Sequence, residues 1–320
     1  MEHKDGMTTA LVFPGQGSQT VGMGKALAEA FPASREVFAR VDAALGESLS
    51  RIIFEGPEAE LTLTANAQPA LMATSLAALA ALESVAGLDV ARDAAFVAGH
   101  SLGEYSALCA ARALTIEDAA RLLRIRGSAM QKAVPVGVGA MAAILGLDFP
   151  AVAEIAALAS AESGGAVCEA ANDNGGGQVV ISGAKAAVEK AMELAKQKGA
   201  KRALALPVSA PFHCALMQPA ADAMRKALAS TKVSRPVVPV VANVSAGPLT
   251  DPDAIRDSLV AQVTGTVRWR ESVAFMAAAG VTRFVEIGAG KVLAGLVKRI
   301  ADGASAISVG TAADVEGFGQ

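Results

Sequence analysis

Cysteine, histidine and aromatic residues are all scarce in this chain of 320 residues. It holds three cysteines and three histidines, and aromatic residues make up only 4% of it. Cys109, Cys168 and Cys214 are odd in number, widely separated and without a C-x-x-C pair, which argues against a disulfide framework and a zinc site. A basic excess is also missing. The net charge is −3, so the chain has no global positive field with which to attract nucleic acid.

Apolar runs long enough to span a membrane are missing as well, although 52% of the residues are hydrophobic. The longest candidate, Pro69–Leu82, ends at Glu83, whereas a spanning helix needs roughly 20 apolar residues. We expect it to form a helix buried in a large core. Met1–Gly6 lacks the apolar segment of a secretory signal, and we expect it to be a leader that precedes Met7. The sequence therefore predicts a cytoplasmic protein that does not enter the membrane.

Short β-type runs alternate with longer helical patterns, which predicts an α/β fold with a largely parallel sheet. The expected strands are Ala10–Phe13, Phe96–Ala98, Val237–Val241 and Arg283–Ile287. The expected helices are Gly22–Glu29, Gly103–Ala110, Ile116–Ala133, Ala215–Ala229, Arg270–Ala279 and Lys291–Ile300.

The order of the expected strands and helices changes between about Val138 and Ala205, which indicates a second structural unit. In chain order we expect strand Met141–Leu145, helix Pro150–Ser160, strands Val167–Ala171 and Gln178–Ser182, helix Lys185–Lys198 and strand Arg202–Leu206. This β-α-β-β-α-β order is typical of ferredoxin-like domains. We predict a ferredoxin-like subdomain at 136–206, inserted into a larger domain formed by 7–135 and 207–320.

Three glycine-rich stretches do not fit phosphate-binding loops. GQG (Gly15–Gly17) lacks the third glycine at the dinucleotide-binding spacing, and GAGK (Gly288–Lys291) lacks the spacing of a P-loop. NGGG (Asn174–Gly177) has the composition of a hairpin turn. Nucleotide binding through these stretches is therefore not expected.

A fourth stretch, GHSLG (Gly99–Gly103), fits its surroundings. It matches G-x-S-x-G with an apolar strand before it and a helical pattern after it, the setting in which this motif presents a nucleophilic serine on a strained turn. The helix amino terminus would point N–H groups at an anion forming beside Ser101. Ser101 is therefore the candidate nucleophile, and the alternative is a glycine-rich turn with an incidental serine.

A serine nucleophile needs a base, and the chain has few candidates. His3 lies in the expected leader, and His100 adjoins Ser101 on the turn, where we expect it to support the loop. His213, in a loop between prolines, is the favoured general base. No acidic residue stands out as its partner, so a backbone carbonyl or an amide side chain would orient the ring.

RLLRIR (Arg121–Arg126) places several arginines on the helix that follows. Most arginines of this kind lie on a solvated face. One that turned inward would bind a carboxylate, because the planar guanidinium matches two carboxylate oxygens.

Six motifs occur together in a fixed order. They are FPGQGSQ (Phe13–Gln19), GHSLGEYS (Gly99–Ser106), RGSAMQ (Arg126–Gln131), NDN (Asn172–Asn174), PVSAPFH (Pro207–His213) and EIGAGKVL (Glu286–Leu293). In this order they resemble the malonyl-CoA:acyl carrier protein transacylases of bacterial-type fatty-acid synthesis, from about Thr8 to Ile300. The resemblance implies an α/β-hydrolase-like catalytic core with an inserted ferredoxin-like subdomain.

The resemblance also implies a function and the roles of matching residues. The enzyme would move malonyl from malonyl-CoA to the phosphopantetheine thiol of acyl carrier protein through a malonyl-serine at Ser101, with His213 as base. Arg126 would pair with the malonyl carboxylate, and Gln16 with the backbone amide of Leu102 would form the oxyanion hole. The main chain of Gln262 would orient the histidine. Residues implied to line the acyl and pantetheine channel are Gln68, Met130, Asn172, Asn174, Phe212 and Asn243.

The same resemblance implies the partners. The substrates would be a coenzyme A thioester and an acidic carrier protein that binds transiently, with no metal and no resident cofactor. We expect a monomer. The expected docking surface consists of basic residues on the inserted unit and the last helix, namely Lys190, Lys196, Lys198, Lys201, Arg202, Lys291, Lys298 and Arg299.

Two other functions share some of these features. An esterase or thioesterase also has the serine turn, but it would carry an H-G-G-G-type loop and a histidine near the carboxyl end, whereas about a hundred residues follow His213. A catalytically inactive carrier-binding module would have no need to retain Ser101, His213, Arg126 and Gln16 together.

Overall fold

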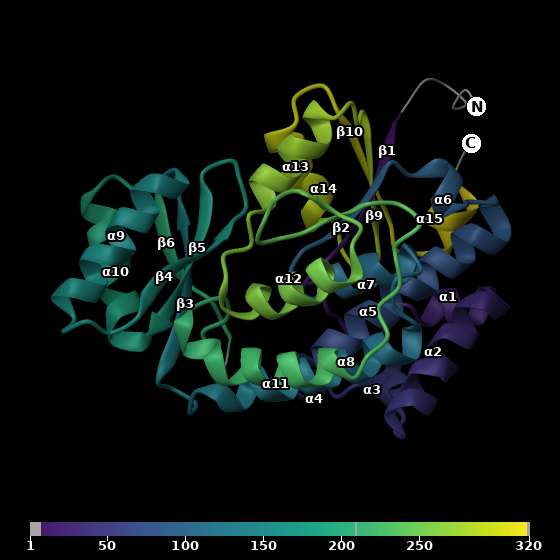
Figure 1. Cartoon of the computed structure of the whole chain (residues 1–320), viewed down its shortest axis with the longest axis horizontal. Helices are drawn as coiled ribbons and strands as arrows, with labels where there is room; N and C mark the ends of the chain where they lie inside the picture. Colours follow the sequence, from purple (N-terminus) through teal and green to yellow (C-terminus); the bar gives the residue numbers. More distant parts are fainter. Residues whose placement is uncertain (1–7, 209, 319–320) are drawn as a thin grey trace.

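Two β-sheets organise the residues that the computed structural model describes, 8–208 and 210–318 (Figure 1). Met1–Gly6, which includes His3, lies outside these residues, so the expectation about a leader stays a prediction. The larger sheet has six strands and the smaller has four. The combination of a largely parallel sheet with a smaller antiparallel one confirms the predicted fold class.

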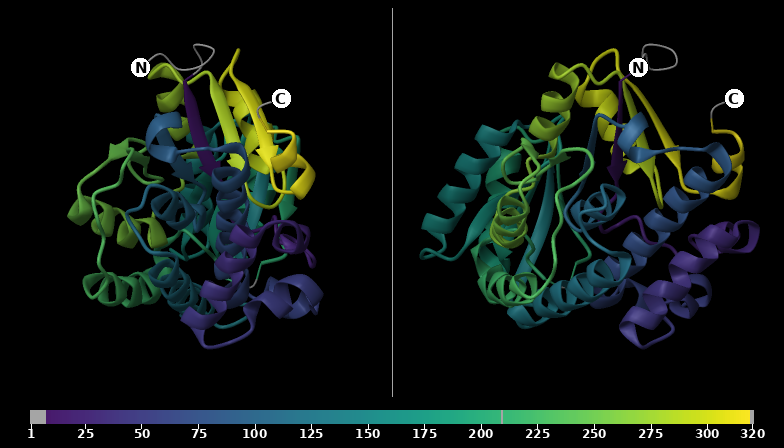
Figure 2. Two further views of the ribbon diagram at one scale, coloured as in Figure 1. Left: turned by 90° about the vertical axis from the view of Figure 1, so that its right-hand side faces the viewer. Right: turned by 45° about the vertical axis from the view of Figure 1, so that its right-hand side comes forward.

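The six-stranded sheet has the order β10-β9-β1-β2-β7-β8, and all neighbours are parallel except β7 and β8. Its strands are β1 (Thr9–Phe13), β2 (Phe96–Gly99), β7 (Val240–Val241), β8 (Pro248–Leu249), β9 (Arg283–Ile287) and β10 (Ser305–Val309). β1 and β9 come from opposite ends of the chain and run side by side (Figure 2). The central strands are apolar on both faces because helices cover both sides.

Alternation along β1 shows how the two faces are filled. Leu11 and Phe13 belong to the larger hydrophobic core, whereas Ala10 and Val12 belong to a second core on the opposite face. The second core contains residues of α13 (Trp269–Ala278) and α14 (Val292–Ile300). The larger core contains residues of α1 (Lys25–Ala30), α2 (Pro32–Leu45), α3 (Leu49–Glu55), α4 (Glu58–Thr62), α5 (Thr64–Ala81), α6 (Val90–Asp93), α7 (Gly103–Ala110), α8 (Ile116–Ala133), α11 (Gln218–Ala229), α12 (Pro252–Thr264) and α15 (Ala312–Glu316).

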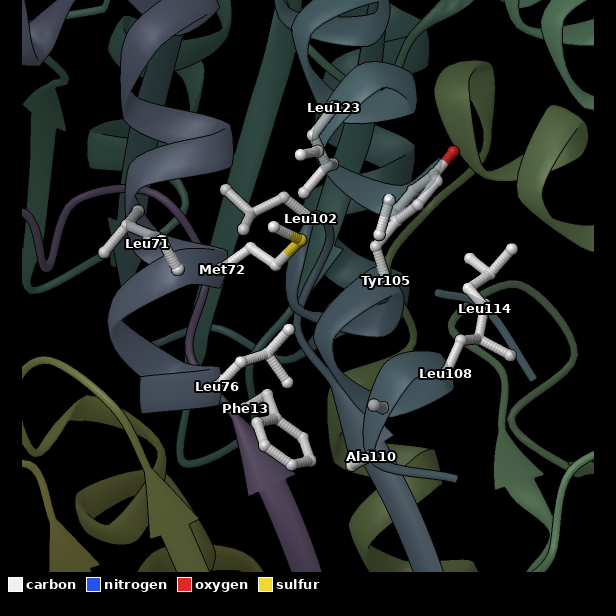
Figure 3. Close-up of a cluster of buried hydrophobic side chains, with 14 of the residues drawn as sticks. Phe13, Leu71, Met72, Leu76, Leu102, Tyr105, Leu108, Ala110, Leu114 and Leu123 are labelled. Atoms are coloured by element: carbon white, nitrogen blue, oxygen red, sulfur yellow. The ribbon is translucent and has the colours of Figure 1, made fainter. Parts of the chain in front are cut away.

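α5 is the helix predicted to be buried in the core. With the π-helical turn Leu82–Ala86 it is the one helix in the described ranges long and apolar enough to cross a membrane by length and composition. However, 72% of its most apolar window is buried inside the protein. It packs against α7, and Figure 3 shows Met72 of α5 beside Leu102 of the serine-bearing turn.

The four-stranded sheet is antiparallel and has the order β4-β5-β3-β6. Its elements in chain order are β3 (Gly139–Leu145), α9 (Phe149–Glu162), β4 (Cys168–Asp173), β5 (Gln178–Ala184), α10 (Lys185–Gln197) and β6 (Arg202–Ala205). This is the ferredoxin-like arrangement. α9 and α10 both cover one face of the sheet, on the outer side of the molecule in Figure 1. The domain boundaries at 136 and 206 stay a prediction.

A short backbone pairing joins the two units. Asn172 at the end of β4 forms a parallel bridge with Val267, just before α13. Two backbone hydrogen bonds make this bridge, from Asp173 N to Val267 O at 2.9 Å and from Val267 N to Ala171 O at 2.8 Å. The bridge places the hairpin of the smaller sheet against the larger domain, where the serine turn lies.

Some predicted bounds were wrong for local reasons. The strand expected at Val237–Val241 is reduced to Val240–Val241, because Pro239 has no N–H for the sheet and Val237 is exposed. The helix expected from Gly22 begins at Lys25, since Gly22 and Gly24 have φ of 91° and 72°. The helix expected at Ala215–Ala229 opens with a 3₁₀ turn, Ala215–Met217, before α11.

Candidate active site

Ser101 lies on a tight turn between β2 and α7. Its φ is 53°, in the left-handed region that a non-glycine residue adopts only when the surroundings enforce it. A Cβ on Gly99 would lie 1.9 Å from the backbone of Gly103, and a Cβ on Gly103 would lie 2.3 Å from the carbonyl oxygen of Phe13. Both glycines are therefore needed for the chain to turn this sharply, and the turn presents the Ser101 hydroxyl beyond the end of the sheet.

The side chain of His213 reaches this hydroxyl from 112 positions further along the chain. Its Nε2 lies 2.8 Å from Ser101 Oγ, and its Nδ1 lies 2.9 Å from the backbone carbonyl oxygen of Gln262. The carbonyl can only accept, so Nδ1 carries the proton and Nε2 is free to accept the serine proton. Burial, together with the nearby positive charge of Arg126, lowers the pKa of His213 to about 3, so the ring is neutral near pH 7.

Arg126 is the arginine of RLLRIR that turns inward. It is 1% exposed and lies on the buried face of α8 with Leu122 and Met130, one turn away on either side. Its Nη1 donates to Gln68 Oε1 at 2.8 Å, and its Nη2 donates to Gln262 Oε1 at 2.8 Å. Both acceptors are neutral amide oxygens, so these bonds orient the guanidinium without cancelling its charge.

The guanidinium also reaches the nucleophile. Arg126 Nη2 lies 3.1 Å from Ser101 Oγ, and burial lowers the pKa of Arg126 from its ordinary value. Arg126 Nε is buried and has no hydrogen-bond partner within the described ranges. A buried cation with unused donors beside a nucleophile is a binding site for an anionic group.

A cavity of ≈ 670 Å³ opens onto these three side chains. Ser101, His213 and Arg126 all line it. Of the residues expected along a substrate channel, five line the cavity, namely Gln68, Met130, Asn172, Asn174 and Phe212. The cavity lies between the two sheets, because the lining also includes Met141 and Val180 of the smaller one.

The expectation for Asn243 was wrong. Asn243 is fully buried and is not among the residues lining the cavity. It lies behind the turn, where its Oδ1 accepts from Ser101 N at 2.7 Å and its Nδ2 donates to Gly99 O at 2.7 Å. These two bonds join both sides of the strained turn, so Asn243 holds the nucleophile in place.

Gln16 and Leu102 lie at the cavity, next to the serine. Within 8–208 and 210–318, the backbone N–H of neither residue donates a hydrogen bond inside the protein. The Gln16 side chain is held at the cavity by Thr64, with Nε2 donating to Thr64 Oγ1 at 3.2 Å. Two unused N–H groups beside a nucleophile can stabilise an oxyanion.

His100 lies on the turn and links it to the smaller sheet. Its Nε2 lies 2.8 Å from Asn174 Oδ1 on the hairpin that follows β4, and its ring lies 5.7 Å from that of Trp269. Burial lowers the pKa of His100, so it too is neutral near pH 7. The residue beside the nucleophile thus connects the turn to the inserted unit.

Comparison with known proteins shows the family. A family model described as an acyl transferase domain matches residues 10–317. A malonyl CoA-acyl carrier protein transacylase of Bacillus subtilis is 50% identical over 291 residues, which cover 91% of this chain and 90% of the relative. The chain belongs to the malonyl-CoA:acyl carrier protein transacylase family. A transacylase of Escherichia coli K12 is also 50% identical, over 92% of this chain and 93% of the relative.

Solved structures of transacylases share the whole fold. An acyl-carrier-protein-S-malonyltransferase from Bartonella henselae is 58% identical with a TM-score of 0.94, and the match covers 97% of this chain and 98% of the other. A malonyl transacylase solved in complex with a type II polyketide synthase acyl carrier protein is 44% identical with a TM-score of 0.92, over 97% and 98% of the two chains.

The roles of two residues at the site were not predicted from the sequence. One is the side chain of Gln262, for which only a main-chain role was expected, although its amide bonds Arg126, Ser101 O and Glu104. The other is Glu104 itself, a buried acid behind the turn. Its presence in GHSLGEYS was visible, but nothing in the sequence indicated that it would face residues about 140 positions away.

Proposed function

We propose that this protein transfers the malonyl group from malonyl-CoA to the phosphopantetheine thiol of acyl carrier protein, supplying fatty-acid elongation. One observation carries the proposal: Ser101 Oγ lies 2.8 Å from His213 Nε2 and 3.1 Å from Arg126 Nη2. A nucleophile, its base and a cation suited to the malonyl carboxylate therefore meet at one point.

The first half of the reaction makes the malonyl-serine. His213 Nε2 takes the proton of Ser101 Oγ as the oxygen bonds to the thioester carbon. The backbone N–H groups of Gln16 and Leu102 stabilise the resulting oxyanion, and one such donor is worth about 3 kcal/mol. The carbon–sulfur bond then breaks, and coenzyme A leaves as a thiol with the proton from His213.

The second half runs the same steps in reverse. The phosphopantetheine thiol of the carrier gives its proton to His213 Nε2 and attacks the malonyl-serine carbonyl. The bond to Ser101 Oγ breaks, and the serine oxygen recovers the proton. The neutral imidazole expected from the low pKa of His213 starts both halves in the correct protonation state. His213 carries each proton between the serine and the thiol, Arg126 supplies the positive charge, and we propose that no metal or resident cofactor takes part.

Arg126 gives the selectivity for malonyl. The carboxylate of malonyl would pair with the buried guanidinium, whereas an acetyl group would leave it without an anionic partner. Gln68 and Gln262 hold the guanidinium at the nucleophile, and Met130, Phe212, Asn172 and Asn174 complete the acyl and pantetheine channel.

The acidic carrier would dock at the mouth of the cavity, on basic residues of α14 and of the chain at the start of β6. Val292 and Leu296 of α14 line the cavity, Lys298 and Arg299 are exposed on the same helix, and Lys291 is exposed just before it. The Arg299 side chain lies beside Gly176 of the hairpin, and Lys201 lies beside Gly146 at the same end of the smaller sheet.

The α10 residues of the expected docking surface lie away from the cavity, so we leave them out of the proposed docking surface. Met141 and Val180 of the smaller sheet line the cavity, whereas Ile144 and Ile181 point to the other face and pack with α10. Lys190, Lys196 and Lys198, at α10 or its end, therefore lie behind the sheet, away from the cavity, and Lys190 is paired with Glu162. Arg202 is exposed at the start of β6, next to Lys201.

Charge reversal tests this docking surface. Arg299→Glu and Lys201→Glu should slow malonyl transfer to the carrier, with a weaker dependence of the rate on salt. Lys196→Glu makes the same charge change on the far face and should leave the rate unchanged. Equal losses from both faces would contradict the assignment.

The remaining partner proposals follow from the same chemistry. We propose a cytoplasmic monomer that binds neither membrane nor nucleic acid, consistent with its net charge of −3. Sedimentation at several concentrations tests the oligomeric state, and a concentration-dependent mass would contradict a monomer.

Intact-mass measurement after mixing with malonyl-CoA tests the function. A malonyl adduct that is lost in Ser101→Ala, and that passes to the holo carrier, is the expected result. Free malonate accumulating without transfer would identify a thioesterase instead. No adduct at all would identify a binding module.

A further inference from the structure

Glu104 is a buried acid that the mechanism above leaves unused. It is 2% exposed and lies in the first turn of α7, three residues after Ser101. It is not among the residues that line the cavity. A buried acid needs hydrogen bonds to remain in the interior, so its partners show what it does.

Two donors converge on one oxygen of Glu104. Its Oε2 accepts from the backbone N–H of Asn243 at 3.0 Å and from the side chain Nε2 of Gln262 at 2.9 Å. These two residues lie 139 and 158 positions away, so the acid joins three distant segments of the chain. An acceptor-only group fits a place where only donors point inward.

Each of these partners in turn holds the reacting groups. Asn243 Oδ1 accepts from Ser101 N at 2.7 Å, which fixes the strained turn. Gln262 O accepts from His213 Nδ1 at 2.9 Å, which fixes the ring, and Gln262 Oε1 accepts from Arg126 Nη2 at 2.8 Å. One carboxyl group is thus a single hydrogen bond away from the residues that position nucleophile, base and cation.

Burial raises the pKa of Glu104 to about 7, and the surrounding groups oppose that rise. The amino terminus of α7 stabilises a negative charge in its first turn. The Arg126 guanidinium attracts the Glu104 carboxylate without forming an ion pair, and Tyr105 and His213 are the other titratable groups close to Arg126. The bonds to Asn243 and Gln262 do not depend on that charge, because a neutral carbonyl oxygen can accept from both donors.

We propose that Glu104 is a positioning residue for acyl transfer, which holds Asn243 and Gln262 so that Ser101 and His213 stay in hydrogen-bond contact. The inference rests on the proposed function, since it concerns the same serine. Glu104 touches no reacting atom, so its loss should lower the rate of the chemical step and leave substrate binding largely intact.

Three variants separate this role from general stability. Glu104→Ala removes the acceptor, Glu104→Met removes it but retains most of the volume, and Glu104→Gln retains an amide oxygen that can accept both bonds. Ser106→Ala is the matched control on α7, because Ser106 is fully buried and its Oγ has no hydrogen-bond partner in the described ranges.

The measurement is single-turnover malonyl-enzyme formation from malonyl-CoA, followed by intact mass. We expect Glu104→Ala to lower the maximal rate about 100-fold with little change in half-saturating malonyl-CoA, as for a small misplacement of reacting groups. Glu104→Gln should remain within about 5-fold of wild type, the range expected when the acceptor is kept. Glu104→Met should match Glu104→Ala, and it replaces that variant if the smaller residue prevents folding.

A spectroscopic signal adds a test that a merely structural role would not affect. The Nδ1 proton of His213, held by the Gln262 carbonyl, should give a protected imidazole N–H signal in protein with ¹⁵N-labelled histidine, absent in His213→Gln. We expect Glu104→Met to lose or shift this signal and Ser106→Ala to keep it.

Several results would overturn the inference. They are a folded Glu104→Met at the wild-type rate, a Glu104→Gln as slow as Glu104→Met, or a loss confined to malonyl-CoA binding. Failure of wild type to form a malonyl adduct would instead refute the proposed function, which keeps the two failures distinct.

Discussion

His213 Nδ1 faces the backbone carbonyl oxygen of Gln262 at 2.9 Å. In a serine–histidine–aspartate triad a carboxylate occupies this position and stabilises the imidazolium. A neutral carbonyl fixes the tautomer equally well but adds no full negative charge. The site is therefore a dyad, and the low pKa of its histidine follows from burial and from the neighbouring Arg126.

The first prediction concerns pH. The folded pKa of His213 is lowered from 6.5 to about 3, so the base stays neutral from pH 8 down to 5 and is lost only as the pH falls through about 3. Malonyl-enzyme formation should show no loss centred near pH 6.5. Rates of malonyl-enzyme formation between pH 5 and 8 check this. They are measured also in Glu104→Gln, which removes a second titrating group, because burial raises the pKa of Glu104 to about 7. A loss near pH 6.5 in both proteins would contradict the prediction.

Selectivity provides the second prediction. Arg126→Ala should lower malonyl transfer by about 100-fold or more, because a buried charge pair broken on one side costs about 3–5 kcal/mol. Relative transfer of acetyl should rise, since no buried cation is left without a partner. The control is Arg121→Ala, an exposed arginine of the same helix paired with Asp118. Competition between malonyl-CoA and acetyl-CoA gives the ratio of malonyl to acetyl transfer. An unchanged ratio in Arg126→Ala would contradict the carboxylate-binding role.

The third prediction separates the effects of the two hydrogen bonds that the Asn243 side chain makes to the turn. Asn243→Ala leaves Ser101 N and Gly99 O buried without partners, and each should cost about 1–3 kcal/mol of the free energy of unfolding. Asn243→Asp keeps an acceptor for Ser101 N but loses the donor to Gly99 O. We expect it to retain more acylation than Asn243→Ala. Denaturation and acylation rates check both variants, and equal acylation would show that the bond to Ser101 has no influence.

The turn itself gives a stability prediction. Gly99→Ala would force a Cβ to within 1.9 Å of Gly103, so we expect little folded protein. Gly295→Ala places the same methyl group on α14, where nothing lies within 4 Å. It should be neutral or stabilising by up to about 1 kcal/mol. Thermal melting of both tests the contrast, and similar melting temperatures would show that the turn tolerates a side chain.

The sequence predicted best those features that depend on neighbouring residues. The serine turn, the strand before it and the bounds of α7 and α8 follow from local spacing, and all were found as expected. β10 was missed because only Ala306 and Val309 of its five residues are buried, which leaves no apolar run. α2 was missed although Val37, Phe38 and Val41 lie on one buried face at helical spacing.

Features built from distant contacts could not be predicted from the residues alone. Neither the placement of Asn243 behind the turn nor the multiple bonds of the Gln262 side chain leaves a pattern in the sequence. They arise where α12 and the loop after β7 meet α7, and that meeting is decided by the packing of whole helices. The position of the α10 lysines relative to the cavity could not be predicted for the same reason, since their face depends on which side of the smaller sheet the helix covers.

The neutral acceptors around Arg126 have a consequence for the resting enzyme. Its guanidinium is removed from water while its Nη1 and Nη2 bond only to uncharged oxygens, so the substrate-free protein keeps an electrostatic cost that an arriving anion relieves. Occupancy should therefore raise the melting temperature by more than the same contacts would on an exposed surface. We therefore expect part of the preference for malonyl, with its free carboxylate, to be held as a lower stability of the unloaded protein.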